Sequence, residues 1–392
     1  MVHCRLAARS AAACTALAVG LITPSFVRAQ TSMGTPNAVF PEDFGTVQTV
    51  RELPDGRVLV ADPLGKELYA VDMDAGVRTV IGSLGQGPEE YLQPDAVWAL
   101  PGDSTLLVDL GNGRNVALDP DLRFGPTSPL ATGDPRSSLV LALPQGVDGL
   151  GRIYSRSMGG LGGALSDSAA IMRITRGTPG IDTVAMFKLQ GRTQTRSGDA
   201  NNQNVQISPV PLSPEDAWGV AADGSVAVAR SVDYHVEWIS PDGSMTRGTA
   251  ISFDAVRIGT AEKEEYLTTQ SRNGGGIQVA ATINNGAIEM NFSRGGGGNR
   301  REIDQYEWPD RKPPFYSGRL NIDVEDRVWV QRHVDAGEPS TYDIFDRRGE
   351  HVGAVSFEHG KRVVGFGPTS VYVVRYDDFD LNYLERYDLP ST

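Results

Sequence analysis

Six charged residues occupy one position of a repeated pattern, at the end of a short β-type run that follows a turn. They are Asp62, Asp109, Arg156, Arg230, Arg332 and Arg375. Guanidinium groups bind carboxylate and phosphate in a two-pronged geometry. If the fold brings these residues to one rim, the four arginines form a candidate anion-binding site. In the structural alternative, the aspartates accept hydrogen bonds from turn amides and the arginines pair with acids of adjacent repeats.

Histidines are the other side chains that could transfer protons near neutral pH. After residue 29 the chain has four of them, namely His235, His333, His351 and His359. His333 directly follows Arg332, so it is the one histidine that we place in the same candidate site, as an acid or base. His235 begins a β-type run and is expected to be structural. The catalytic patterns G-x-S-x-G and H-E-x-x-H do not occur.

A loose group of oxygen ligands lies near the C-terminus, formed by Asp377, Asp378, Asp380 and Asn382. It lacks the spacing and the closing glutamate of an EF-hand loop. The pattern therefore favours a solvated hairpin tip over a calcium site. We expect no metal site and no cofactor.

The charged positions belong to six copies of one unit. Their second β-type runs are Val58–Asp62, Thr105–Asp109, Arg152–Arg156, Val226–Arg230, Val328–Arg332 and Val371–Arg375. Each has one β-type run before it and another after it, and a fourth run follows in the first five copies. Asp-Gly and similar turns between such runs indicate hairpins. Six four-stranded antiparallel units in series predict an all-β fold, a six-bladed β-propeller, with a β-sandwich as the alternative.

The sixth unit ends after its third run, near Leu389. The extended segment Asn37–Pro41 precedes the first unit and is not needed there. We predict that it supplies the missing outer strand, because an open ring would leave an unpaired sheet edge.

Two insertions, Lys188–Ser213 and Asp254–Pro314, interrupt the period. Each joins the fourth strand of one unit to the first strand of the next, so both should lie on the face of the charged positions, over blades three to five. Within the second, Thr260–Ser271 predicts one short helix capped by Thr260. Asn273–Gly276 and Gly295–Gly298 indicate flexible loops. Four aromatic residues could line a pocket or anchor the loop: Tyr306, Trp308, Phe315 and Tyr316.

Residues 1–29 have the features of a secretory signal. A basic start precedes the apolar segment Ala11–Ile22, and small residues occupy the −3 and −1 positions of a cleavage site before Gln30. Cys4 and Cys14 both lie inside this segment, and its removal leaves a charge of about −16. We expect a secreted or periplasmic protein without a membrane span. Its acidic surface argues against binding nucleic acid or anionic lipid.

Three short motifs resemble those of bacterial NHL-like six-bladed propellers. Gly85–Tyr91 (GQGPEEY) is similar to the family's G-x-G-P-G-E-F junction, Val60–Asp62 to its V-A-D strand end, and Asp323–Val330 to its D-x-D-G-x-h-W-V motif, where h is apolar. The chain departs from the family where Glu89 replaces a glycine and where arginine replaces aspartate in four repeats. The resemblance implies the architecture and little about activity.

Two functions remain compatible with this reading. The first is a monomeric binding module that holds a peptide, a glycan or a small anion on the face with the insertions. The alternative is a lyase or lactone hydrolase with a channel metal as Lewis acid. Such a metal needs converging carboxylate, Asn or His ligands, whereas the aligned positions offer two acids and four arginines that would repel a cation. The first hypothesis, which is not an enzyme, is therefore favoured.

Overall fold

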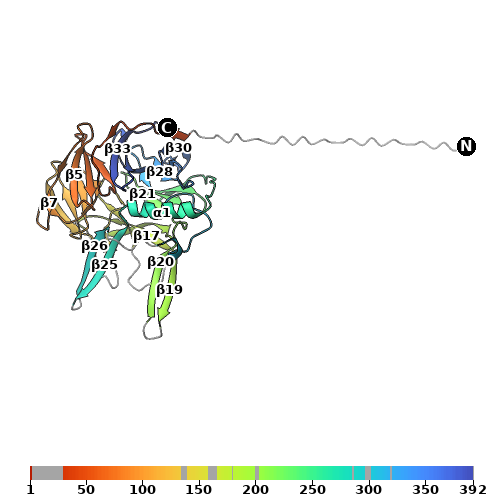
Figure 1. Ribbon diagram of the computed structural model, residues 1–392, viewed down its shortest axis with the longest axis horizontal. Coiled ribbons are helices and arrows are strands. Elements are labelled where there is room, and N and C mark those ends of the chain that lie inside the picture. Colours follow the sequence, from red (N-terminus) through yellow and green to blue (C-terminus); the bar gives the residue numbers. More distant parts are fainter. Residues whose placement is uncertain are drawn as a thin grey trace.

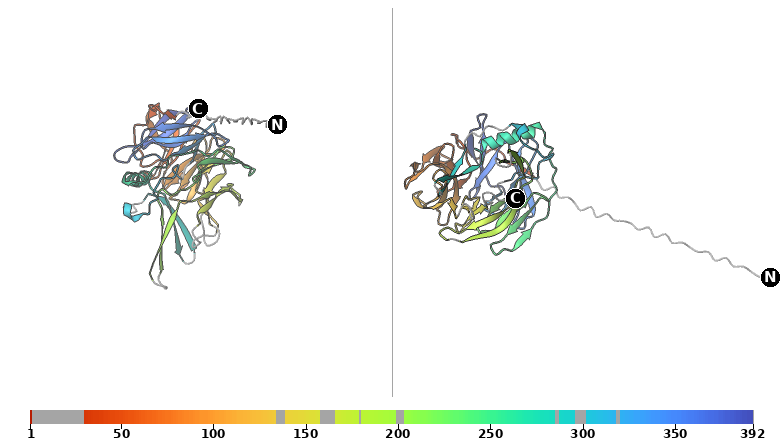
Figure 2. Two further views of the ribbon diagram at one scale, coloured as in Figure 1. Left: turned by 90° about the vertical axis from the view of Figure 1, so that its right-hand side faces the viewer. Right: turned by 90° about the horizontal axis from the view of Figure 1, so that it is seen from below.

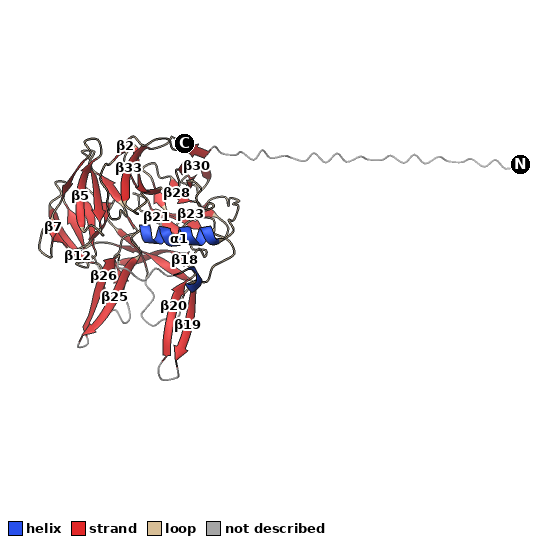
Figure 3. Ribbon diagram, in the orientation of Figure 1, coloured by secondary structure: helices blue, strands red, loops and turns tan. Residues whose placement is uncertain are grey.

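The computed structural model describes Met1 and residues 30–133, 139–157, 166–178, 180–198, 203–284, 287–295, 302–317 and 320–391. The predicted signal therefore lies almost wholly outside the described residues. Six antiparallel sheets follow one another along the chain and form a six-bladed β-propeller, which confirms the predicted fold (Figures 1 and 2). Apart from α1 (Thr260–Arg272) and the short helix η1 (Ile303–Gln305), the described regular structure is β (Figure 3).

The blades follow in chain order. Blade one contains β3 (Val50–Glu52), β4 (Val58–Asp62), β5 (Glu67–Asp72) and β6 (Val77–Val80). Blade two contains β9 (Pro94–Ala99), β10 (Thr105–Asp109), β11 (Arg114–Leu118) and β12 (Phe124–Pro129). Blade three contains β15 (Gly146–Val147), β16 (Ile153–Arg156), β17 (Ser168–Ile174) and β18 (Ile181–Lys188).

The remaining blades have the same order. Blade four contains β21 (Ala217–Val220), β22 (Val226–Arg230), β23 (His235–Ile239) and β24 (Met245–Arg247). Blade five contains β27 (Asn321–Ile322), β28 (Val328–Gln331), β29 (Ser340–Phe345) and β30 (His351–Phe357). Blade six contains β31 (Arg362–Phe366), β32 (Ser370–Tyr376) and β33 (Asn382–Asp388).

The second strand of each blade is apolar on both faces because neighbouring blades cover it from both sides. In β4, Val58 and Val60 pack with Val364 of blade six, whereas Leu59 and Ala61 pack with residues of blade two such as Leu107. These four β4 side chains are fully buried. The alternation of side chains along a strand thus joins each blade to the one before and the one after.

The ring closes through a strand from the start of the described chain. Strand β2 (Ala38–Val39) pairs antiparallel with β33, with Ala38 opposite Arg386. The backbone N–H groups of Phe40 and Phe44 donate to carbonyls of β33 at 2.9 and 2.8 Å. This is the pairing expected of Asn37–Pro41. A further strand, β1 (Gln30–Ser32), was not predicted and runs parallel to β30 as a fifth strand of blade five.

The insertions contain more regular structure than their composition indicates. The first forms a hairpin of β19 (Arg192–Gly198) and β20 (Gln203–Pro209), and the second contains α1 and a hairpin of β25 (Ile277–Asn284) and β26 (Ala287–Arg294). Both hairpins project from one face of the ring (Figure 1). Short pairs also form at β7 (Ser83–Leu84) with β8 (Glu90–Tyr91) and at β13 (Ala131–Thr132) with β14 (Val140–Leu141).

The predicted helix is present and one residue longer than expected, but its cap differs. Gly259 is the N-cap, and the carboxylate of Glu262 accepts a hydrogen bond from the Gly259 backbone N–H at 2.9 Å. Thr260 is the first helical residue, so the prediction of a Thr260 cap was wrong. Within the described part of the chain, neither helix has the length and apolar character needed to cross a bilayer.

Candidate functional site

Asp62 and Asp109 have the structural role that was considered as the alternative. Both side chains are buried. Asp62 accepts hydrogen bonds from the backbone N–H groups of Gly45 at 2.7 Å and Thr46 at 3.0 Å, which fixes the entry to blade one. Asp109 accepts in the same way from Leu92 at 3.1 Å. Their oxygens are therefore used by turns and do not line the cavity described below.

Two of the predicted arginines are also paired inside the fold. Arg230 contacts Glu237 at 2.7 Å and Asp216 at 3.0 Å, and Arg375 contacts Glu385 at 3.2 Å. These acids belong to the same blade as their arginine, not to the adjacent blade as the structural alternative proposed. Neither arginine is among the residues that line the central cavity described below. The four arginines therefore do not form one ring.

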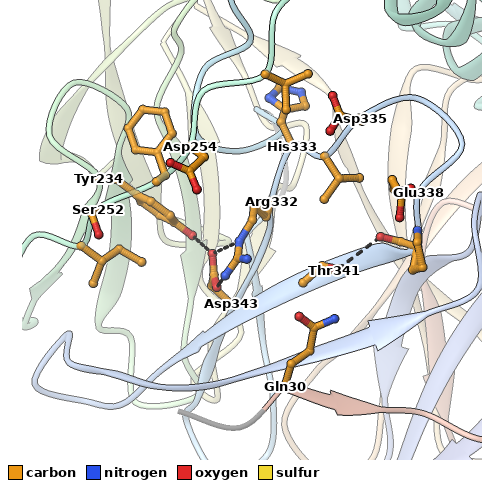
Figure 4. Close-up of a pocket in the computed structure, with 15 residues that line it drawn as sticks. Gln30, Tyr234, Ser252, Asp254, Arg332, His333, Asp335, Glu338, Thr341 and Asp343 are labelled. Atoms are coloured by element: carbon orange, nitrogen blue, oxygen red, sulfur yellow. Dashed lines mark hydrogen bonds and ion pairs between the residues drawn. The ribbon is translucent and has the colours of Figure 1, made fainter. Parts of the chain in front are cut away.

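Arg332 lies between two cavities. Its guanidinium pairs with the buried carboxylate of Asp343, which also accepts a hydrogen bond from the Tyr234 hydroxyl at 2.6 Å (Figure 4). Nε2 of His351 lies 3.2 Å from the same carboxylate. Burial opposes ionisation of Asp343, but hydrogen bonds with His351 and Arg332 lower the pKa of its carboxyl below the usual range. On one side of Arg332 is the cleft of Figure 4, about 500 Å³ in volume.

His333 does not have the properties of an acid or base near neutral pH. Its side chain is buried, and desolvation lowers the pKa of the imidazole to about 3. The ring lies against Tyr316, with centroids 3.9 Å apart, and Nδ1 is 2.9 Å from the Pro313 carbonyl oxygen. Because the neutral ring then donates through Nδ1, its role here is to hold the wall between the two cavities.

The second cavity spans the axis of the propeller. It has a volume of about 840 Å³ and is lined by residues of blades one, three, five and six and by α1. Blades three and six are opposite each other in a ring of six, so a cavity that touches both lies at the centre. We call it the central cavity. Seven basic and five acidic side chains line it, in a chain whose net charge is −13.

The second insertion covers this cavity and reaches further round the ring than predicted. At the end of α1, Nε of Arg272 is 2.7 Å from Oδ1 of Asp380 in blade six. On β26, Arg294 pairs with Asp95 of blade two and exchanges two hydrogen bonds with the Gln93 side chain, at 2.7 and 2.9 Å. The second insertion, which we call the cap, thus contacts blade six on one side of the cavity and blade two on the other, beyond the expected blades three to five.

Asn273–Gly276 is a turn fixed by hydrogen bonds, not the flexible loop that its glycines indicated. The carbonyl and side-chain oxygens of Asn273 accept hydrogen bonds from Gln48 at 3.0 Å and Tyr376 at 2.8 Å. Gly274 and Gly275 both have a φ of 69°, which glycine adopts without strain. Of Gly295–Gly298, only Gly295 is among the described residues.

The aromatic residues of the insertion divide between the two expected roles. Tyr316 lines the central cavity, whereas Phe315 is fully buried in the core between blades four and five. Trp308 packs edge-on against Tyr266 of α1, with centroids 5.7 Å apart. The insertion therefore uses Phe315 as an anchor and Tyr316 as a wall.

Five of the seven basic side chains in the central cavity have an acidic partner. The pairs are Arg272–Asp380, Arg294–Asp95, Lys312–Glu265, Arg332–Asp343 and Lys361–Glu385. Among the described residues, Arg156 and Arg362 form no ion pair. Arg362 instead donates to the Val47 carbonyl at 2.6 Å and the Tyr376 hydroxyl at 3.4 Å. These two guanidinium groups are therefore the ones available to a ligand anion.

Sequence reasoning selected Arg156 but missed Arg362. Arg362 begins β31, the first strand of blade six, and first strands line the axis of a propeller. A charged residue in a strand that faces the channel was the available signal, whereas the predicted site comprised the ends of second strands and His333.

Glu215 is an acidic residue of the central cavity with a perturbed pKa. Burial raises the pKa of its carboxyl above the usual range, while Ser317 and Arg156 act in the opposite direction. Burial likewise raises the pKa of the Tyr266 phenol, and Glu215 contributes to that rise. Glu215 lies between the first insertion and β21, a position that the repeat pattern did not single out.

The carboxylates near the C-terminus serve a turn and the cap. Asp377 accepts hydrogen bonds from the backbone N–H groups of Phe379 and Leu381, both at 2.9 Å, and Asp380 holds Arg272. Asp378 and Phe379 at the tip are exposed, as expected of a solvated hairpin tip, although Asp380 also contacts Arg272 of α1. Within the described ranges, no group of three or more His, Cys, Asp or Glu side chains is arranged to hold a metal ion.

Comparisons with known proteins show that the chain is similar to other propellers in fold. No protein-family model and no curated protein matches the chain, so the resemblance to NHL-like propellers is not confirmed. Among solved structures, virginiamycin B lyase from Staphylococcus aureus is 10% identical with a TM-score of 0.38, over 90% of this chain and 98% of that one. Regucalcin from Agrobacterium tumefaciens, described as a calcium-binding protein, is 11% identical with a TM-score of 0.37, over 93% and 97%.

A third structure, a protein of unknown function from Bacteroides thetaiotaomicron, is 9% identical with a TM-score of 0.43, over 91% of this chain and 74% of that one. Likenesses at this level concern the fold alone. The strand topology of the chain makes it a six-bladed β-propeller, and its function has to be argued from the central cavity.

Proposed function

We propose that the protein binds a small oxyanion, a carboxylate or phosphate group on a peptide, a glycan or a small molecule, in the central cavity. The observation that carries this proposal is the pair of guanidinium groups, Arg156 and Arg362, that line the cavity without an acidic partner among the described residues. Arg156 is exposed at the end of β16 and Arg362 is half-buried, and a guanidinium without a counter-ion gains charge-assisted hydrogen bonds when an oxyanion binds.

The cap supports the same proposal. A cavity of about 840 Å³ lies within the range of small-molecule sites, and α1 covers it. Hydroxyl and amide groups of Tyr376, Gln331 and Asn321 also line it, and they could hydrogen-bond polar groups next to the anion. The mixture of several neutral donors with two arginines that form no ion pair among the described residues suits a small polar acid better than an apolar ligand.

Replacing Arg156 or Arg362 should weaken anion binding in the central cavity. We expect Arg156→Ala and Arg362→Ala each to weaken binding roughly ten- to a hundredfold, because a hydrogen bond to a charged group contributes about 1.5–3 kcal/mol. Thermal-shift screens with D-galacturonate, citrate and inorganic phosphate, followed by calorimetry, would separate carboxylate from phosphate recognition.

Arg348→Ala is the matched control, because the Arg348 side chain is 78% exposed on blade five and does not line the cavity. It should bind the same probes as the wild type does. Equal affinities in all four proteins would show that neither cavity arginine contacts the anion, and the proposal would then fail.

We also propose that the protein is exported and begins at Gln30 in its mature form. The support is the basic start, the apolar run and the small residues before Gln30 in the sequence. N-terminal sequencing of protein isolated from its native host should give Gln30 or a residue next to it. Recovery of chains that retain Met1 would contradict export by cleavage.

A further inference from the structure

Tyr316 has a hydroxyl in the central cavity that the fold does not use. Its backbone N–H donates to the Gln331 carbonyl at 2.9 Å, and its ring lies against His333, with centroids 3.9 Å apart. These contacts fix the ring, whereas the hydroxyl makes no hydrogen bond to any described residue. Protein atoms do not enclose this hydroxyl, so a ligand in the cavity can reach it.

Gln331 provides a second unused donor next to Tyr316. The Tyr342 hydroxyl accepts a hydrogen bond from the Val363 backbone N–H at 3.0 Å and donates its own hydrogen to Oε1 of Gln331 at 3.4 Å. The carboxamide oxygen of Gln331 is therefore occupied. Its NH2 group binds no described residue and can only donate, so it is left for a ligand.

The same hydrogen bonds connect these donors to Arg362. Val363, whose N–H binds the Tyr342 hydroxyl, directly follows Arg362 in β31. The Arg362 guanidinium is half-buried, and its Nη2 and Nε donate to the Val47 carbonyl and the Tyr376 hydroxyl. Its Nη1 group makes no hydrogen bond to any described residue. One cation and two neutral donors therefore line the side of the cavity formed by blades five and six.

The cap fixes the direction of this cation. The Tyr376 hydroxyl that accepts from Arg362 at 3.4 Å donates in turn to Oδ1 of Asn273 at 2.8 Å, and Asn273 is the C-cap of α1. A guanidinium held in this way loses little conformational freedom when a carboxylate binds to it.

We infer that the ligand of the central cavity is a small acid with a hydroxyl or carbonyl oxygen next to its carboxylate. Arg362 binds the carboxylate, and Tyr316 and Gln331 donate to the neighbouring oxygen. This inference rests on the proposed function and narrows the class of acid. Simple carboxylic acids leave both donors without an acceptor, and a ligand that displaces water from a donor without replacing the hydrogen bond loses affinity.

Two pairs of acids test this preference, because the members of each pair differ only in one hydroxyl next to a carboxylate. They are malate with succinate and citrate with tricarballylate. Calorimetry at about pH 7.5, where the carboxyl groups of all four acids are ionised, should give a wild-type affinity about tenfold higher for the hydroxylated member of each pair. This comparison needs no variant, so it does not depend on how well any variant folds.

Tyr316→Phe keeps the ring against His333 and removes only the hydroxyl. It should bind malate roughly two- to tenfold more weakly than the wild type does and succinate equally well. Gln331→Met should behave in the same way, whereas Arg362→Ala should weaken the binding of both acids. Tyr383→Phe is the matched control, because the Tyr383 ring lies 4.7 Å from the Arg375 guanidinium carbon and does not line the cavity. It should keep the wild-type preference.

Equal affinities of the wild type for malate and succinate would overturn the inference. So would retention of the full preference for malate in either Tyr316→Phe or Gln331→Met. If all four acids bind equally and Arg362→Ala weakens their binding, this inference fails and the proposed function stands. If none of the four acids, D-galacturonate or phosphate binds, both fail.

Discussion

A chain that begins at Thr46 should not give a stable propeller. This truncation removes β2, the closing strand of blade six, together with Phe40 and Phe44, which are 0% and 1% exposed in the core between blades six and one. Loss of one buried phenylalanine side chain costs about 3–5 kcal/mol, and two such losses approach the whole stability of a typical domain. The cut also exposes the edge of β33. Circular dichroism should show no cooperative thermal transition.

The matched control is a chain that begins at Asn37. It lacks β1, whose three residues are exposed on the outer edge of blade five, and residues 33–36, of which only Met33 packs against the core, as a partly buried side chain. It keeps β2, Phe40 and Phe44. Its melting temperature should stay close to that of the chain that begins at Gln30. If the two truncated chains melt alike, then β2 does not close the ring in solution.

Replacing Asp343 by Asn should destabilise the protein by about 3 kcal/mol at neutral pH. The Asp343 carboxylate is fully buried and accepts from Arg332 and the buried Tyr234 hydroxyl, so the change leaves a guanidinium without its counter-ion. We place the loss at the lower end of the range for buried pairs because the Arg332 side chain is 36% exposed and can be partly hydrated. Urea denaturation would measure it.

Acid should reduce the difference in unfolding free energy between the wild type and Asp343→Asn. The pKa of Asp343 is lower in the folded state than in the unfolded chain, so its contribution is complete above the unfolded value of about 4 and is lost as the pH falls through the folded value. The gap in unfolding free energy should therefore shrink near pH 3.

Asp182→Asn is the control, since the Asp182 carboxylate pairs with Arg173 but is 60% exposed. It should change stability by less than about 1 kcal/mol. A similar loss in both variants would show that burial does not decide the effect.

The periodicity of the chain was enough to predict the six blades and their order. Each second strand carries apolar residues on both faces, as in Val58–Ala61, and such runs are stable only when other sheets cover both sides. The closing strand followed from the same count, because one blade lacked a strand and one extended segment was spare. These are local features that recur along the chain, so a single sequence displays them.

The hairpins of the insertions were missed for a related reason. Strands β19 and β20 are rich in Gln, Thr and Asn, and they belong to no repeat. Hydrogen bonding between the two adjacent segments stabilises the hairpin, and the residue types of the segments do not indicate this pairing. The contact of Arg294 with Asp95, which spans 199 positions, is equally invisible in the sequence.

What the sequence determined by itself is therefore the architecture, the face that carries the insertions and three residues of the central cavity, Arg156, Arg332 and His333. Only the tertiary structure decided which charged side chains form ion pairs inside the fold. Arg230 and Arg156 end equivalent strands, yet Arg230 is neutralised by Glu237 and Asp216 whereas Arg156 faces the cavity without an ion pair among the described residues. Residue type and strand position are local properties, but whether an arginine is neutralised depends on which acids the neighbouring strands and turns place within a few ångströms of it, and the Coulomb energy is set by that distance.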